Sequence, residues 1–112
     1  MIKGYIYIIS NYNRSVLYIG VTGELENRML RHKVGEGSLF AAKYNCKYLL
    51  YYEDFPEMTQ AISREKQLKR WHREWKFNLI KAVNPNLNDL AKDWFDDETL
   101  ENAKLGYRNH DQ

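Results

Sequence analysis

The sequence has little of several features that define whole classes of protein. Its only cysteine, Cys46, excludes an internal disulfide and a cysteine-based zinc cluster. No uncharged stretch approaches the roughly 20 apolar residues that span a bilayer, so we expect no transmembrane helix. The apolar run near the N-terminus alternates and then meets Asn11, Asn13 and Arg14, which is unlike a signal peptide. A protein of the reducing cytoplasm is therefore expected.

The length and composition are those of one folded domain. A chain of 112 residues lies within the usual range of a single domain, roughly 100 to 150 residues. Its content of 44% hydrophobic and 14% aromatic residues provides enough apolar surface to fold alone. We find no internal repeat and no low-complexity segment.

Charge is unevenly distributed along the chain. The net charge of +2 combines +6 over residues 1–88 with −4 over residues 89–112. The basic part favours a polyanionic partner, and the acidic end is expected to face away from that partner. Two solvated faces that bind nothing would explain the same distribution. We expect a core domain over residues 1–90 and an acidic C-terminal helix or tail over residues 91–112.

Residue periodicity predicts both strands and helices. Alternating β-branched and aromatic residues indicate two strands joined as a hairpin and a third strand further on, at residues 4–9, 15–21 and 47–53. Apolar spacing of three and four residues predicts helices at residues 24–34, 58–75 and 77–83, with an acidic helix in the remainder. The segment between the first helix and the third strand is ambiguous.

The predicted helix over residues 58–75 carries an acid where apolar side chains are expected. Glu65 and His72 both fall on its apolar arc. A neighbouring arc carries four cations, Lys66, Lys69, Arg70 and Arg73. Because an unpaired buried carboxylate is costly, a cation, a metal ion or hydrogen bonds must compensate it. An ion pair with an arginine is the simplest such arrangement.

The first predicted helix shows the opposite anomaly. Arg28 and His32 lie four residues apart on the face that also carries Leu25 and Met29. One explanation pairs Arg28 with Glu65 and treats His32 as an ordinary core residue. The other has both side chains converge on a phosphate, since arginine offers a planar fork of donors to phosphate oxygens.

Together these residues resemble the GIY-YIG nuclease superfamily, and the resemblance covers residues 4 to about 90. It is carried, at the family's spacing, by Tyr5-Ile6-Tyr7, Tyr18-Ile19-Gly20, Arg28, His32 and Glu65. Residues 64–71 and 78–90 resemble the long-helix and closing motifs of the small stand-alone, single-domain members. The resemblance implies an α+β fold, with a three-stranded antiparallel sheet flanked by helices.

The resemblance also implies roles for individual residues. In the nucleases that this chain resembles, two tyrosines, an arginine and a glutamate surround the scissile phosphate with one divalent metal ion. Carried over, these are Tyr7, Tyr18, Arg28 and Glu65, with His32 moving protons or binding phosphate and Glu65 holding Mg²⁺ or Mn²⁺. One carboxylate with phosphate oxygens and water suits Mg²⁺. Either tyrosine could position or deprotonate water, and deprotonation requires a pKa below the usual value of about 10.

One position departs from the family's pattern, and the position of one further residue is not fixed by spacing. Val21 stands where some relatives carry a lysine, so Lys33 or Lys43 would have to replace that proton carrier. Some members have an asparagine that supports the phosphate site, and either Asn84 or Asn88 would be its counterpart here. The sequence does not choose between the two asparagines.

The function implied is that of a metal-dependent endonuclease that hydrolyses DNA phosphodiester bonds, with a role in DNA repair or recombination. Lys66, Lys69, Arg70 and Arg73 would contact the nucleic acid, and phosphate contacts alone do not separate DNA from RNA. The alternative is a nucleic-acid-binding module on the same scaffold that cleaves nothing. A third reading is a structural or protein-interaction domain. Target and oligomeric state are open.

Overall fold

The first two strands form the hairpin that the sequence predicts. The computed structural model describes residues 3–110, with β1 (Gly4–Ser10) and β2 (Leu17–Thr22) paired antiparallel. Arg14 turns the loop between them with a φ of 63°, and its guanidinium donates to the carbonyl oxygen of Leu87. The hairpin is thereby tied to a loop that lies far along the chain.

The third strand completes the sheet. β3 (Tyr48–Phe55) pairs antiparallel with β1, which gives the order β2-β1-β3. The register shifts between Ile8 and Ile9, so Leu50 is passed over in the pairing and forms a bulge. The expected α+β fold with a three-stranded antiparallel sheet is confirmed.

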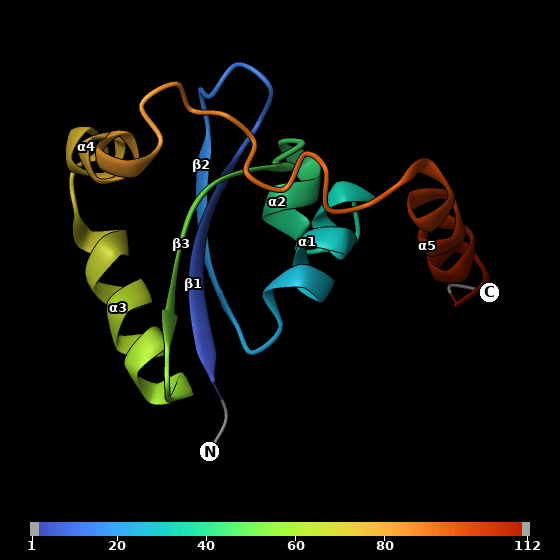
Figure 1. Cartoon of the computed structure of the whole chain (residues 1–112), viewed down its shortest axis with the longest axis horizontal. Coiled ribbons are helices and arrows are strands. Elements are labelled where there is room, and N and C mark those ends of the chain that lie inside the picture. The colour runs from blue at the N-terminus through green and yellow to red at the C-terminus, as the bar shows by residue number, and fades with distance from the viewer. Residues whose placement is uncertain (1–2, 111–112) are drawn as a thin grey trace.

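Helices cover both faces of this sheet. In the described residues they are α1 (Leu25–Lys33), α2 (Leu39–Lys43), α3 (Met58–Arg70), α4 (Arg73–Val83) and α5 (Asp97–His110). Figure 1 shows α3 and α4 on one side of the sheet, α1 and α2 on the other, and α5 beyond α1. None of the helices within residues 3–110 combines the length and apolarity that crossing a membrane requires.

The long helix predicted over residues 58–75 is wrong at its C-terminal end. α3 stops at Arg70, Trp71 and His72 are extended, and the next helix starts at Arg73. The break contains no glycine or proline, so tertiary contacts override helix propensity here. Trp71 packs against the core, and the Arg73 guanidinium donates to the carbonyl oxygen of Ser15 at 2.6 Å. His72, predicted on the buried arc, is consequently exposed.

Alternation along β1 builds two separate cores. Ile6 and Ile8 point toward α3 and α4, where the buried cluster is apolar apart from the Tyr51 hydroxyl. Tyr7 and Ile9 point toward α1 and α2, where the second cluster forms. Its other members are Leu25, Met29, Ala41, Cys46, Leu49 and Ala91. The sheet therefore divides the molecule into two faces with different contents.

The segment after α4 folds back over the second face. Asp89 pairs with the Lys33 ammonium, and its other carboxylate oxygen accepts from the backbone N–H of Leu49 at 3.0 Å. Ala91 is fully buried, and Trp94 packs against the same cluster. Part of the segment expected as an acidic tail thus contributes to the core.

Candidate active site

Tyr7 lies at the centre of the second face and owes its position to a glycine on the neighbouring strand. The β1–β2 register places Tyr7 opposite Gly20, and the Tyr7 side chain is fully buried. A Cβ atom on Gly20 would lie 2.3 Å from both Cζ and the hydroxyl oxygen of Tyr7. Gly20 is therefore needed because the tyrosine ring passes directly over the backbone of β2.

The Tyr7 hydroxyl forms a buried pair with His32 of α1. The hydroxyl oxygen and Nε2 of His32 are 2.9 Å apart, and the histidine is only 2% exposed. Its Nδ1 atom has no hydrogen-bond partner among the described residues, and a Cβ on Gly37 would lie 2.0 Å from it. Gly37 thus lets the backbone after α1 close over the imidazole.

Burial makes this pair uncharged at neutral pH. Desolvation, and then the nearby Tyr18, raise the pKa of Tyr7 to about 12, against the opposing charge of Arg28. Desolvation, and then the charges of Arg28 and Arg31, lower the pKa of His32 to about 4. The Tyr7 phenol and the His32 imidazole are therefore both neutral at pH 7.

The structure brings Tyr7, Tyr18, Arg28 and Glu65 together from four separate elements. The rings of Tyr7 and Tyr18 have centroids 6.3 Å apart, and the charges of Arg28 and Glu65 both act on the Tyr7 hydroxyl. Tyr18 and Arg28 are half-buried, whereas Tyr7 is fully enclosed. Tyr7, Tyr18 and His32 thus contact one another, and Arg28 and Glu65 are near enough for their charges to act on Tyr7. We call these five residues the candidate cluster.

Glu65 is partly buried, as the helical pattern predicts, and its ion-pair partner is a lysine. Its side chain is 16% exposed, and the Lys69 ammonium lies 3.3 Å from Oε2, one helical turn further along α3. Arg28 forms no ion pair within residues 3–110, so an Arg28–Glu65 pair is not the explanation for either residue. Arg28 therefore keeps a charged fork of donors beside the two tyrosines.

The oxygen donors at this cluster fit a hard cation held by few protein ligands. Among residues 3–110 there is no group of three or more histidine, cysteine, aspartate or glutamate side chains that could hold a metal ion. Glu65 is a single half-buried carboxylate with a second oxygen available beside its contact to Lys69. One carboxylate leaves the other coordination positions to water and phosphate oxygens. This suits Mg²⁺ and Mn²⁺, whereas a structural zinc site takes four protein ligands.

The four cations expected to contact nucleic acid have three different placements. Lys66 and Arg70 are exposed on α3, and they line a groove of about 480 Å³ together with Ser63, Gln67 and Trp71. Lys69 pairs with Glu65 one turn earlier on the same helix. Arg73 lies beyond the helix break and binds the hairpin loop through Ser15. Lys66 and Arg70 thus give α3 a basic groove, and Lys69 is the cation in contact with Glu65.

An ion-pair network orients α3 against the sheet and was not foreseen from the sequence. The Arg64 guanidinium donates to both carboxylate oxygens of Glu53 at 2.9 and 3.0 Å. The Tyr51 hydroxyl donates to the same carboxylate at 2.5 Å, and the Arg64 guanidinium lies over the Trp71 ring. Because Arg64 precedes Glu65, this network fixes the rotation of the helix that presents the acid. The only hint in the sequence was that Arg64 and Glu65 are neighbouring residues of opposite charge.

Two expected auxiliary groups are occupied elsewhere. Lys33 pairs with Asp89 and faces the Tyr48 ring, so it is not available to replace the missing lysine at position 21. The Asn84 amide donates to the carbonyl oxygens of Leu50 and Asn88 and accepts from the Asn88 N–H. Asn84 thus holds the loop after α4 on β3 and has its hydrogen bonds filled by backbone.

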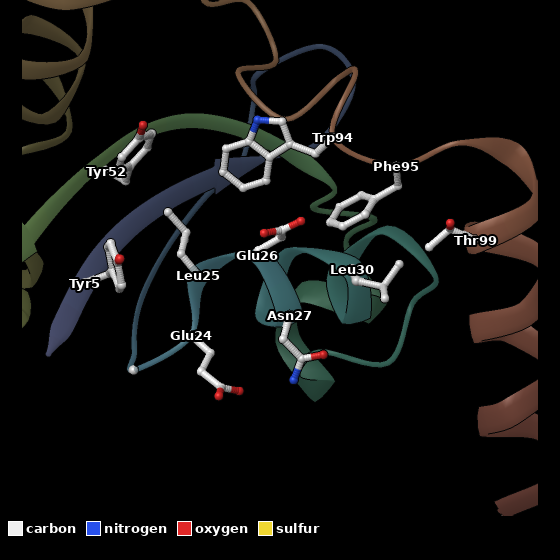
Figure 2. A pocket seen from close by; sticks show the side chains of 11 residues that line it. Tyr5, Glu24, Leu25, Glu26, Asn27, Leu30, Tyr52, Trp94, Phe95 and Thr99 are labelled. Carbon is white, nitrogen blue, oxygen red and sulfur yellow. The ribbon is translucent and has the colours of Figure 1, made fainter. Parts of the chain in front are cut away.

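A separate pocket is lined by none of the five cluster residues. It has a volume of about 1040 Å³ and is lined by residues of α1, the sheet and the C-terminal segment. Figure 2 shows Trp94 and Phe95 of that segment facing Glu26 and Leu30 of α1 across it. The carboxylates of Glu24 and Glu26 at this cavity oppose a polyanion. These carboxylates therefore disfavour nucleic-acid binding at this pocket.

A second unforeseen feature is the aromatic surface of α2. The Phe40 ring lies nearly parallel to Tyr18, at 5.9 Å between centroids and 25° between planes, and Tyr44 follows at 4.8 Å. Phe40 is 46% exposed and Tyr44 is 40% exposed. The spacing of four residues and a serine before them were present in the sequence, but five residues are too few for a periodic pattern to stand out.

Comparison with known proteins identifies similar chains. A family model described as the GIY-YIG catalytic domain matches residues 3–78. A UPF0213 protein of Staphylococcus saprophyticus is 34% identical over 80 residues, which cover 71% of this chain and 96% of that protein. Another from Haloquadratum walsbyi is 35% identical over 75 residues, covering 67% and 83% of the two chains.

A further relative has nearly the same identity over a longer stretch. A UPF0213 protein of Clostridium perfringens is 35% identical over 89 residues, which cover 80% of this chain and 95% of the relative. The names of these three relatives state no activity. No solved structure matches the chain significantly.

Proposed function

The chain belongs to the GIY-YIG catalytic domain family, and we propose that it is a divalent-metal-dependent endonuclease that hydrolyses DNA phosphodiester bonds in DNA repair or recombination. The observation that supports the proposal is the contact between the Tyr7 and Tyr18 rings, with Arg28 and Glu65 near enough for their charges to act on Tyr7. These side chains come from α1, α3, β1 and β2. A phosphate and one hard cation would satisfy all of them.

Arg28 is the group that would bind the phosphate. Its guanidinium has no ion-pair partner in the described part of the chain and lies beside the tyrosine pair, where it can offer two parallel donors to phosphate oxygens. The same fixed charge would stabilise the additional negative charge that develops as water attacks phosphorus.

Tyr7, supported by His32, would orient the attacking water once substrate binding admits that water to the enclosed hydroxyl. With a pKa of about 12, Tyr7 is protonated at neutral pH, so its hydroxyl acts through hydrogen bonds and is not a resting base. The contact to His32 Nε2 fixes the direction of that hydroxyl. Tyr18 is less buried and forms the outer wall of the cluster, where substrate would arrive.

Glu65 would hold the metal ion, with its remaining coordination positions open to phosphate and water. When bound, Mg²⁺ or Mn²⁺ supplies positive charge that offsets the charge developing on the phosphate and leaving oxygens. Lys69 would have to yield part of its 3.3 Å contact with Glu65 as a cation enters. We expect cleavage to stop when EDTA removes the divalent ion.

The test compares cleavage and binding in the same set of variants. The wild type, Glu65→Gln, Arg28→Ala and the exposed control Glu101→Gln are incubated with supercoiled, linear, single-stranded and flapped DNA in Mg²⁺, Mn²⁺ or EDTA. We expect metal-dependent cleavage by the wild type and by Glu101→Gln, with a loss of about 100-fold or more in the other two. DNA binding by Glu65→Gln in EDTA should remain close to that of the wild type.

The same data separate the non-catalytic alternative. A binding module would cut none of the substrates, and all four proteins would retain an affinity that falls with salt concentration. Equal cleavage by wild type and Glu65→Gln would show instead that the activity comes from elsewhere. Parallel reactions on RNA of the same sequence address the choice between DNA and RNA.

A further inference from the structure

We propose that Phe40 of α2 and Tyr44 at its C-cap, together with Tyr18, form a stacking platform for unpaired nucleobases beside the site of cleavage. This inference rests on the proposed nuclease function and specifies its substrate class. The substrate would be a nucleic acid with a single-stranded segment at the scissile bond. An uninterrupted duplex would not use the platform.

The three rings form a continuous series that leads outward from the buried cluster. Tyr18 contacts Tyr7 and His32 at its inner side, with centroids 6.3 and 5.9 Å away. On its outer side it stacks on Phe40, which in turn contacts Tyr44 at 4.8 Å. A strand whose phosphate lies at Arg28 would therefore have its neighbouring bases close to exposed aromatic faces.

The aromatic residues are exposed because of how α2 is anchored. Ser38 caps the helix by accepting from the N–H of Ala41, and Ala41 is buried in the second cluster. Phe40 and Tyr44, four residues apart, remain 46% and 40% exposed beside this anchor. An exposed apolar patch on a preformed helix commonly marks a binding surface.

A nucleic-acid strand fits this surface better than an apolar partner does. The Lys43 ammonium lies 5.4 Å from the centre of the Tyr44 ring, so a cation accompanies the aromatic faces. The platform is also continuous with the proposed phosphate site, because Tyr18 belongs to both. Interleaved aromatic and basic side chains are typical of surfaces that bind single strands, where bases stack and phosphates meet cations.

The need for unpaired bases follows from geometry. In a duplex both faces of each base are covered by its neighbours, and only the edges are accessible in the grooves. Stacking on Phe40 requires a free face, which single strands, flaps and frayed ends provide without the cost of unstacking a duplex. The platform would thus favour substrates of that class.

The experiment measures binding and cleavage separately. The full chain binds a 2-aminopurine-labelled DNA single strand, or the same strand in a duplex, in EDTA, and the fluorescence of the base reports stacking. The variants are Phe40→Ala, Phe40→Leu, which keeps apolar bulk but removes the ring, and Tyr44→Ala. Tyr12→Ala is the control, since Tyr12 is 81% exposed and its ring contacts Tyr48 instead.

The expected result is selective for the single strand. Phe40→Ala and Phe40→Leu should bind it about ten-fold more weakly than the wild type and abolish the quenching of 2-aminopurine, with duplex binding changed less than about two-fold. Tyr44→Ala should have a smaller effect in the same direction. Tyr12→Ala should match the wild type.

Other outcomes overturn the inference without touching the proposed function. Unchanged quenching in Phe40→Ala, or an equal loss for single strand and duplex, would refute the platform even if the wild type cleaves DNA in Mg²⁺. A Phe40→Ala variant that dissociates a dimer in light scattering and keeps its quenching would identify the patch as a contact between copies. Conversely, quenching that requires Phe40 in a protein that cuts nothing would retain the platform and reject the nuclease.

Discussion

The two faces of the sheet are built by alternate residues of the same strands, yet they bury different chemistry. On the α3 and α4 face, Ile6 and Ile8 meet an apolar cluster, and the Tyr51 hydroxyl is paired with Glu53. On the α1 and α2 face, a phenol and an imidazole are enclosed, and Nδ1 of His32 has no partner within residues 3–110. Such an atom destabilises a fold by about 1–3 kcal/mol.

This difference separates the residues that hold the fold from those that the proposed chemistry uses. An apolar pair of similar volume in place of Tyr7 and His32 would avoid the desolvation that shifts both pKa values. Local violations of packing rules are most often retained at functional sites. The α3 and α4 face contains no comparable violation among the described residues.

The largest effect on stability is expected on the apolar face. Ile8→Ala should lower the free energy of unfolding by about 2–5 kcal/mol, because Ile8 is fully buried and its removal leaves a cavity. Urea denaturation measures the loss. Cleavage per folded molecule should stay near the wild-type value below the melting transition. A selective loss of cleavage in a folded Ile8→Ala protein would contradict the separation of folding residues from catalytic residues between the two faces.

A smaller loss of stability is expected where the two tyrosine motifs meet. Gly20→Ala should lower the free energy of unfolding by up to about 3 kcal/mol, because the added methyl group would overlap the Tyr7 ring at 2.3 Å. The displaced ring should also reduce cleavage. Gly106→Ala is the control, since nothing lies within 4 Å of its Cβ and alanine favours helix α5.

How much of this was predictable depends on whether the determining contacts are local. The hairpin, the third strand and the first helix follow from alternation and spacing within a few residues. The break at Trp71 and His72 does not, because it depends on packing against the sheet and on Arg73 reaching the hairpin loop. Propensity alone extends the helix through that point.

The candidate site shows the same limit. Tyr7, Tyr18, Arg28 and Glu65 could be selected from spacing and resemblance. In the structure the two tyrosine rings are in contact, and the charges of Arg28 and Glu65 act on Tyr7. The partners could not: Lys69 takes the place expected for an arginine beside Glu65. Which nitrogen of His32 meets Tyr7 is likewise decided by side-chain packing that no sequence pattern encodes.

The buried imidazole should make stability depend on pH. The pKa of His32 is about 4 in the folded chain and about 6.5 when unfolded, so between these values the unfolded state binds more protons. Stability is therefore fully present above pH 6.5 and falls as the pH is lowered. Between pH 7 and pH 5 this one group should remove about 2 kcal/mol.

Urea denaturation at pH 7, 6 and 5 measures this dependence. His32→Gln should lose that component of the slope, whereas His72→Gln, on an exposed residue, should keep it. Identical slopes for the wild type and His32→Gln would mean that the imidazole is not held neutral, and the contrast between the two faces would weaken.

The smallest change in stability and the clearest separation of roles are expected for Tyr7→Phe. The ring that fills the second cluster remains, and only the hydroxyl that meets His32 Nε2 at 2.9 Å is lost, so the free energy of unfolding should change by about 1 kcal/mol. If that hydroxyl orients the attacking water, cleavage should fall by about 100-fold. Tyr5→Phe, half-buried on the same face, serves as the control and should retain activity.

Because Ile8→Ala is expected to change stability but not cleavage, the opposite behaviour of Tyr7→Phe would establish that neighbouring residues of one strand serve folding and chemistry separately. Unchanged cleavage in a folded Tyr7→Phe protein would instead assign Tyr7 to packing and leave Tyr18 to position the water.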